Sequence, residues 1–377
     1  MNLAEIMVYT DIRQLHQMAS HYGCECNPNS KNELITTLLS NLRHKGTIAK
    51  EIEQLSREET HFFLLLFLDK RTQMSLEDLL AKAGVALEAK KERKQEEART
   101  YIAKAMKRGW IFPAKTKAVG QYQVPHDIRE PLLQAWLLRW QNEAEPFAAE
   151  PEAYRDEGTA LVDDIMQFLQ FLQREPVPLT ADGSMYKRYQ QQLLQFLQIK
   201  EEPLAPQRWR FGYGLHFDLY PDRFSLIYDF CYYQRWIEEV PGQVMLTEAG
   251  LERLQTPSGD ALHGDTLYHE VIRFWMRLYK RAIPNLPMLV QLIPMMASQG
   301  WVSQREFSRS LLPWIRPFYY DEPQNILVNR ILKMMVHLGL IRVGQVHDGE
   351  WIYSGTYASQ SWLRKYNGFT DTTILLK

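Results

Sequence analysis

The sequence contains little cysteine. Only Cys24, Cys26 and Cys231 occur among its 377 residues. Secreted domains that rely on disulfides carry many more cysteines at regular spacings, so a disulfide framework is excluded and a reducing compartment is expected. The first residues hold no basic run followed by an apolar stretch, so we also expect no signal peptide. Both observations favour a cytoplasmic protein.

Long apolar runs and an excess of charge of one sign are also missing. The longest apolar run, residues 62–68, is far shorter than the roughly 20 residues that a helix needs to cross a bilayer, so no membrane partner is expected. The 44 Lys and Arg residues are balanced by 45 Asp and Glu, which gives a formal net charge of −1. This excludes a globally basic, histone-like protein. It leaves room for a local basic face, because nucleic-acid contact depends on how charge is distributed.

The familiar motifs of catalysis are absent. The sequence has no P-loop, no Gly-x-Ser-x-Gly elbow, no His-Glu-x-x-His pair and no dinucleotide fingerprint. His16, His21, Cys24 and Cys26 lie within eleven residues of one another. Cys-x-Cys is tighter than the usual zinc spacing, however, and no second Cys pair follows. We therefore expect no metal at this segment.

Two pairs of adjacent carboxylates, Asp163-Asp164 and Glu238-Glu239, are the other enzyme-like feature. Acid–base and metal-dependent catalysis both use paired carboxylates. Neighbouring residues on a helix point in different directions, however, and neither pair has a histidine or a Gly-rich loop close by in the sequence. We interpret both pairs as solvated faces. The sequence thus predicts a protein that is not an enzyme and has no cofactor.

A recurring unit is the most informative feature that is present. In residues 56–124 and again in residues 303–353, two amphipathic helices with a polar break are followed by a Gly and two strand-like runs. Capping-box sequences at Ser56 and Ser303 mark helix starts, and Asp348-Gly349 suits a hairpin with a type I′ turn. Helix–turn–helix followed by a β-hairpin is the winged-helix plan. We expect a mainly α fold with small β-hairpin wings, built from tandem winged-helix modules.

Breaker-rich and helical stretches divide the chain further. Residues 141–158 are acidic and rich in Ala, Pro and Glu, and residues 256–265 carry Pro and Gly, so both are expected to be linkers. In residues 11–42, two helices flank a polar turn, and the second holds Lys-x-x-Leu-Ile-x-x-Leu. This pattern is similar to the SAP module, a small DNA-binding helix–turn–helix, although an ordinary helical hairpin fits equally well. The expected organisation is a SAP-like hairpin (1–48), winged-helix module 1 (49–140), an acidic linker (141–158), winged-helix-like module 2 (159–255), a linker (256–265) and winged-helix module 3 (266–377).

The strongest local charge excess lies in residues 90–117, where ten Lys or Arg residues face three Glu residues. This stretch covers the expected third helix and wing of module 1, the elements that enter a groove or follow phosphates. The alternative is a solvated charged face. The seven residues that we select as candidate DNA contacts are Lys94, Arg99, Lys104, Lys107, Arg108, Lys115 and Lys117.

Aromatic residues alternate with Arg in three further segments, residues 209–213, 232–236 and 314–320. Such mixtures can stack on unpaired bases and pair with phosphates, and protein-binding hot spots share the same composition. The same residues also suit a core in which the Arg side chains reach to the rim. We favour the core interpretation.

Taken together, a SAP-like hairpin and successive winged-helix modules resemble the helicase-associated region found at the N-terminus of, or encoded beside, bacterial XPB-type DNA helicases. The middle module contributes most, through Pro-Val-Pro-Leu-Thr-Ala-Asp-Gly at residues 176–183, Lys-Arg-Tyr at 187–189 and Leu-Leu at 193–194. The resemblance spans residues 159–356. Since the sequence encodes no helicase motor, the resemblance implies an accessory subunit without ATPase activity, and it supplies no catalytic residues.

The predicted function is therefore that of a non-catalytic, nucleoid-associated subunit. We expect it to bind duplex or forked DNA with little sequence preference. We also expect a protein partner, such as an XPB-type helicase or another repair or genome-defence motor. The alternative is a structural scaffold whose winged helices serve only protein contacts, as in chromosome-organising complexes.

Overall fold

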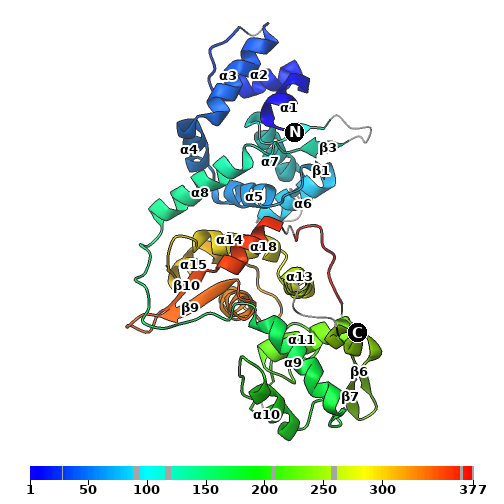
Figure 1. Cartoon of the computed structure of the whole chain (residues 1–377). Helices are drawn as coiled ribbons and strands as arrows, with labels where there is room; N and C mark the ends of the chain where they lie inside the picture. The colour runs from blue at the N-terminus through cyan, green and yellow to red at the C-terminus, as the bar shows by residue number, and fades with distance from the viewer. Residues whose placement is uncertain are drawn as a thin grey trace. The chain divides into compact units, whose positions relative to one another are not determined.

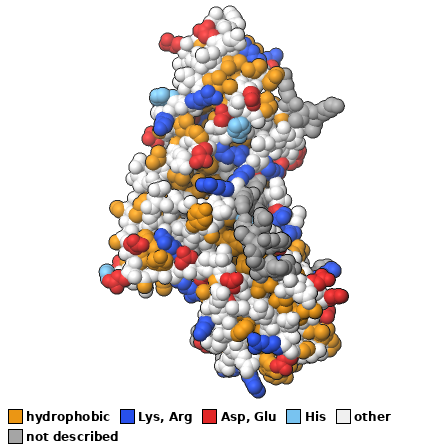
Figure 2. Space-filling view, viewed as in Figure 1, with side chains coloured by type: hydrophobic (Ala, Val, Ile, Leu, Met, Phe, Trp, Pro, Cys, Tyr) orange, Lys and Arg blue, Asp and Glu red, His pale blue; other side chains and the backbone are white. Residues whose placement is uncertain are grey.

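The computed structural model of the protein describes residues 1–27, 29–87, 94–114, 120–205, 209–255, 261–365 and 368–375. Helices dominate, and the strands are short and antiparallel (Figure 1). The chain divides into two compact units, residues 1–146 and residues 147–377. On the face shown in Figure 2, basic and acidic side chains are interspersed. The expected fold class, mainly α with small β wings, is confirmed.

Unit 1 begins with four short helices, of which the second and third are the two that the sequence analysis expected in residues 11–42. Ser30 caps the third helix, because its Oγ accepts a hydrogen bond from the backbone N–H of Glu33 at 3.3 Å. The Glu33 carboxylate accepts from the backbone N–H of Asn27 at 3.1 Å. The four helices are α1 (Leu3–Tyr9), α2 (Ile12–His21), α3 (Lys31–Arg43) and α4 (Lys45–Glu53).

The next elements of unit 1 occur in the order that is typical of a winged helix. Helix α8 (Arg129–Glu143) comes after them in the chain. The strands form a sheet in the order β1-β3-β2. Capping boxes open two of its helices, at Ser56 with Glu59 and at Ser75 with Asp78. The elements are α5 (Arg57–Phe67), β1 (Gln73–Ser75), α6 (Leu76–Ala86), α7 (Lys94–Lys107), β2 (Phe112–Pro113) and β3 (Gln121–Gln123).

The chain leaves α7 at a glycine that the packing requires. Gly109 has φ +68°, in the left-handed region that favours glycine. A Cβ atom at this position would lie 2.6 Å from the Cε of Met18 on α2. The turn at Gly109 thus sets how α7 passes into β2 and lets α2 pack close against it.

The first part of unit 2 repeats the same element order, with its strands in the order β5-β7-β6. Thr247 begins the last helix, because its Oγ1 accepts from the backbone N–H of Gly250 at 3.1 Å. The elements are α9 (Ala160–Arg174), β5 (Val177–Pro178), α10 (Lys187–Phe196), α11 (Asp222–Tyr233), β6 (Ile237–Val240), β7 (Gln243–Leu246) and α12 (Glu248–Gln255).

The second part of unit 2 forms the third winged helix, preceded by α13 (Ala261–Tyr279) and followed by α18 (Tyr357–Lys365). Ser303 caps α15 through the backbone N–H of Glu306 at 3.0 Å. The elements are α14 (Leu286–Met296), β8 (Val302–Ser303), α15 (Gln304–Leu311), a 3-10 turn (Leu312–Trp314), α16 (Pro323–Asn325), a π-helical stretch (Ile326–Leu332), α17 (Lys333–His337), β9 (Ile341–Gln345) and β10 (Trp351–Gly355).

The predicted hairpin lies between β9 and β10, but its turn is of another type. A type I′ turn needs positive φ at both central residues. Only Gly349, with φ +86°, lies in the left-handed region here, and its N–H donates to the carbonyl of Val346 at 2.9 Å. This is a type I turn followed by a left-handed glycine, the usual form of a three-residue hairpin loop.

All three modules share one connectivity, which is helix, strand, two helices, then two strands. In each sheet the module's third strand lies between its first and its second: β1-β3-β2, β5-β7-β6 and β8-β10-β9. The second and third strands of each module therefore form a hairpin, and the first strand pairs with the third. The arrangement is that of tandem winged helices, as the sequence predicts.

Residues 141–158, which we expected to form an acidic linker, contain regular structure and buried residues. α8 extends to Glu143, and β4 (Tyr154–Arg155) pairs with β9 at the edge of the third sheet. Ala148 forms a β-bridge with Trp301, and Glu157 is buried. Residues 147–158 are thus part of the packed structure of unit 2 and not a free tether. Of the second expected linker, residues 256–260 lie outside the described residues and α13 begins at Ala261.

A buried charge cluster joins the two winged helices of unit 2. Arg223 on α11 is fully buried, with its Nε 3.0 Å from Oε2 of Glu157 and its Nη1 2.6 Å from Oδ2 of Asp164 on α9. His337 on α17 places its Nδ1 3.0 Å from the other oxygen of Glu157. The interpretation of Asp164 as a solvated carboxylate is therefore wrong. Burial opposes the charge of Glu157, but His337 and the cations around it outweigh burial and lower the pKa of Glu157.

Candidate nucleic-acid interface

Helix α7 is the third helix of module 1, and it is amphipathic. Its inner face packs through Ala98, Ile102 and Ala105, each less than 5% exposed. Arg99 and Lys107 lie on the exposed side. The 3.6-residue period of the helix thus turns Arg99 and Lys107 toward solvent.

Arg99 and Lys107 form the unpaired part of this face. They are eight residues apart, which is about 12 Å along a helix, and the small exposed residue Ala103 lies between them. In the described part of the chain, neither forms an ion pair. Their charges are available to an anion in solution. We call Arg99, Ala103 and Lys107 the α7 face.

Lys104 is partly neutralised. Its Nζ lies 2.9 Å from Oε1 of Glu59 on α5, while half of its side chain stays exposed. Burial disfavours ionisation of Glu59, but the hydrogen bond from Lys104, the capping bond at Ser56 and the charge of Arg108 lower the pKa of Glu59 overall. Lys104 therefore contributes less net charge to the surface than its position suggests.

Arg108 anchors the interior of unit 1 and is not a surface cation. Its side chain is 11% exposed, with its Nε 3.0 Å from Glu51 on α4 and its Nη1 3.4 Å from Glu59 on α5. The guanidinium lies over the ring of Trp110 at 5.2 Å, and the backbone carbonyl accepts from the hydroxyl of Tyr22 at 2.9 Å. These contacts tie α4, α5 and α7 together. The expectation that Arg108 faces DNA does not fit this environment.

The remaining candidates cannot be placed. Lys115 and Lys117 lie outside the described residues, as does the side chain of Lys94. Their contact with DNA stays a prediction.

The corresponding helices of the other two modules are buried. Residues 223–231 of α11 are all buried, so this helix has no free face. In the helical segment 323–337, nine residues are buried and Lys333 is the exposed cation. Among the three third helices, as far as the structure describes them, only α7 offers an exposed cationic face. The sequence analysis singled out the basic stretch on α7, but the helical pattern of the other two modules did not indicate that their third helices would be covered.

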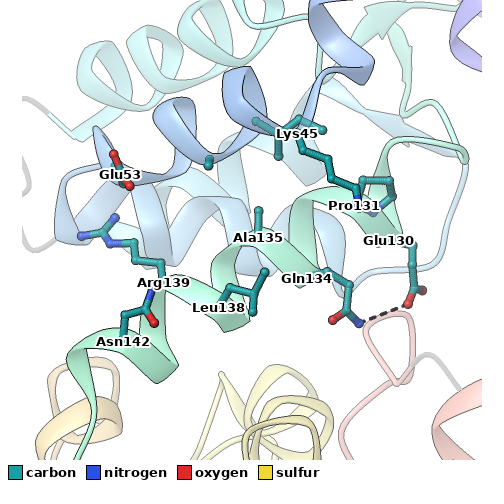
Figure 3. A pocket seen from close by; sticks show the side chains of 11 residues that line it. Lys45, Glu53, Glu130, Pro131, Gln134, Ala135, Leu138, Arg139 and Asn142 are labelled. Carbon is teal, nitrogen blue, oxygen red and sulfur yellow. Dashed lines mark hydrogen bonds between the residues drawn. The ribbon is translucent and has the colours of Figure 1, made fainter.

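A groove lies between α4 and α8 of unit 1, with a volume of about 610 Å³ (Figure 3). Ile48 and Ala49 line it from α4, and Ala135 and Leu138 line it from α8. Leu138 is 60% exposed, which is unusual for a leucine beside an apolar groove. The rim is charged at both ends by Lys45, Glu53, Glu130 and Arg139.

The histidine and cysteine residues near the N-terminus make local contacts. His21 lies 3.1 Å from Glu51, and the Sγ of Cys24 accepts from the amide of Asn41 at 3.4 Å. Within the described residues, no group of three or more His, Cys, Asp or Glu side chains could hold a metal ion.

His216 lies between two carboxylates, as histidines in acid–base catalysis often do, but both of its ring nitrogens are bound to these carboxylates. Nδ1 lies 2.6 Å from Asp229 on α11, and Nε2 lies 2.9 Å from Glu239 on β6. A general base needs a free nitrogen within reach of its substrate. Glu239, which the sequence analysis placed on a solvated face, lies at an exposed position of β6, and its carboxylate also binds this ring.

The core interpretation of the aromatic segments holds only in part. Trp314 and Tyr213 are buried, but Trp209, Tyr319 and Tyr320 are each more than 70% exposed. For these three rings the core interpretation is wrong. Sequence composition alone could not separate them from their buried neighbours.

Comparison with known proteins adds no family to these observations. No family model matches the sequence, and no curated protein matches it significantly. None of the helices in the described ranges is long and apolar enough to cross a membrane.

Proposed function

We propose that the protein is a non-catalytic, nucleoid-associated subunit that binds duplex or forked DNA through the α7 face. The observation that carries this proposal is that α7 is the one described third helix with an exposed, unpaired pair of cations. In winged-helix proteins this helix enters the groove or follows the backbone. The cations Arg99 and Lys107 suit phosphate contacts, which position a protein without reading sequence.

The expected affinity is weak and depends on salt. Two phosphate contacts, from Arg99 and Lys107, correspond to a slope of roughly −2 in log affinity against log salt, at about −0.9 per contact. Lys104 can add a fraction of a contact, since half of its side chain is exposed. A steeper slope is expected if Lys94, Lys115 and Lys117 also contribute.

The test is a fluorescence-anisotropy titration of labelled duplex and forked DNA at two salt concentrations. The variant Arg99→Glu/Lys107→Glu should lose binding, while its thermal midpoint stays close to that of the wild type because exposed charges contribute little to stability. Lys187→Glu/Arg188→Glu on α10 makes the same change in net charge at exposed positions and should bind nearly as well. If Arg99→Glu/Lys107→Glu binds DNA as well as the wild type, the DNA-binding proposal is wrong and the scaffold alternative replaces it.

For the protein partner, we propose an amphipathic helix docked in the groove between α4 and α8. Its lining residues on α8 run from Glu130 to Asn142 at helical spacing, about 18 Å or slightly more than three turns. Helix-in-groove recognition uses apolar anchors at this spacing. Charges at both ends of the rim would then fix the direction of the partner helix.

An XPB-type helicase from the same genome is the partner to test first. Size-exclusion chromatography should show the two proteins eluting together, and Leu138→Asp should abolish this. Val8→Asp on α1 is the matched control, because Val8 is also an exposed apolar residue of unit 1 (55%). The complex, not this chain, should hydrolyse ATP. Co-elution that survives Leu138→Asp would exclude the groove as the interface.

A further inference from the structure

Four aromatic side chains from two distant segments form one exposed surface in unit 2. Trp209, Tyr319 and Tyr320 are 71%, 74% and 72% exposed, and Phe211 is half-buried beneath them. The ring centroids of Trp209 and Tyr320 are 4.7 Å apart, and Phe211 lies 5.6 Å from Tyr320 and 6.2 Å from Tyr319. We call these four residues the aromatic platform.

The turn that carries two of these rings is strained. Tyr319 has φ +51°, a left-handed conformation that is unfavourable for a bulky residue. The turn is closed by two hydrogen bonds between the backbones of Phe318 and Asp321, each 3.0 Å long. Such strain persists only where the surrounding structure imposes it, and it concentrates at functional sites. A glycine would fit the backbone, but it would remove the ring.

Buried contacts hold the two segments of the platform together. The Nε of Arg330 lies 2.9 Å from Asp321 in the strained turn, and its Nη2 donates to the backbone carbonyl of Phe211. The same guanidinium lies 5.3 Å from the ring centroid of Tyr213. The two segments that carry the rings are thus held together before any partner arrives, which lowers the entropy lost on binding.

The charges around the platform favour a partner that carries negative charge. Asp321 is 3% exposed and the side chain of Asp222 is 12% exposed, and both are paired with Arg or Lys. Lys333, which binds Asp222, is 44% exposed, and Arg316 is also exposed. The cations therefore reach solvent more than the acids that they pair with. Glu322 is the exposed acid next to the turn and opposes this trend.

We infer that the aromatic platform binds the unpaired bases of single-stranded DNA. Every base offers a flat face to an aromatic ring, so stacking needs no particular sequence. The ring spacing allows neighbouring rings to contact different bases, while Arg316 and Lys333 attract the phosphates between them. This site is separate from the α7 face in sequence and in the unit that carries it. On a forked substrate, the α7 face would take the duplex and the platform would take the unpaired strand.

The experiment uses the full-length chain and three labelled probes, which are a 12-nucleotide oligo(dT), the same strand without bases, and a duplex. Oligo(dT) should bind at least tenfold more tightly than the abasic strand. Trp209→Ala and Tyr320→Ala should each weaken oligo(dT) binding about tenfold, the effect of losing one stacked base. Trp209→Phe and Tyr320→Phe should stay within about threefold of the wild type. Glu322→Gln should tighten binding.

Substitutions in the aromatic platform and in the α7 face should impair the binding of different DNA probes. The alanine variants of the platform should leave duplex binding unchanged, and Arg99→Glu/Lys107→Glu should affect the duplex more than oligo(dT). Trp209→Ala and Tyr320→Ala each remove a side chain that is more than 70% exposed, so an unchanged thermal midpoint shows that folding is intact. The inference is refuted if the abasic strand binds as well as oligo(dT), or if oligo(dT) does not bind at low salt. It is also refuted if Trp209→Ala instead abolishes capture of a protein partner, since the platform would then be a protein-binding hot spot.

Discussion

The buried residue His216 should make the stability of unit 2 depend on pH. It is 4% exposed, between the carboxylates of Asp229 and Glu239, and the hydroxyl of Tyr228 also donates to Glu239 at 2.7 Å. Burial disfavours the imidazolium cation. The hydrogen bonds and charges of the two carboxylates outweigh it and raise the pKa of His216 from 6.5 to about 9.

The size and the direction of the effect follow from this shift. Each unit of pKa difference between the folded and unfolded states corresponds to about 1.4 kcal/mol, so His216 contributes on the order of 3 kcal/mol when it is charged. Because its pKa is raised in the folded state, the contribution is complete below about pH 6.5 and is lost as the pH rises through about 9.

Urea unfolding followed by tryptophan fluorescence between pH 6.0 and 9.5 provides the measurement. The wild-type free energy of unfolding should fall across this range, and His216→Gln should be less stable at pH 6.0 but should fall much less. His347→Gln is the control, because the side chain of His347 is 92% exposed, and it should follow the wild type. Parallel curves for the wild type and His216→Gln would show that the two carboxylates do not hold His216 as a cation.

Three further substitutions test the packing. Arg223→Met removes the buried cation that pairs with Asp164 and one of the cations around Glu157, and should lower the free energy of unfolding of unit 2 by about 3–5 kcal/mol, as measured by urea unfolding. Arg108→Ala should destabilise unit 1 by about 2 kcal/mol or more, since it removes a guanidinium that bonds the largely buried carboxylates of Glu51 and Glu59. Arg99→Ala should change stability by less than about 0.5 kcal/mol, and equal effects of the two substitutions in calorimetry would contradict the assignment of Arg108 to the interior. Tyr319→Gly should raise the thermal midpoint, by relieving about 1 kcal/mol of backbone strain, while it weakens oligo(dT) binding; a lower midpoint would show that the ring itself stabilises the turn.

Local signals in the sequence predicted the local structure well. The predicted capping residues Ser56 and Ser303 start helices, and the Asp-Gly pair at Asp348 lies in a hairpin turn. These signals depend on residues within four positions of each other, so the sequence alone contains them. The helices and the final hairpin of modules 1 and 3 follow from the same information, whereas the first strand of each module was not predicted.

Burial could not be predicted in the same way, because it depends on residues far apart in the chain. Arg108 and Arg99 both lie in one basic stretch, but only Arg108 meets Glu51, 57 residues earlier. Arg223 and its partner Glu157 are separated by 66 residues. The exposure of Tyr319 depends on the sign of a backbone angle, which composition does not indicate. The sequence therefore identified the basic helix, and the structure decided which of its cations are free.

The pairing of β4 with β9 has a consequence for how the protein is made. Glu157, just after β4, contacts His337, a residue that follows it by 180 positions. Translation adds about 5–20 residues each second, so β4 waits on the order of 10–40 seconds before its partner strand leaves the ribosome. All of unit 1 has been synthesised by then, whereas the edge of β4 stays open to other strands. This interval is the period in which a nascent chain would most need a chaperone.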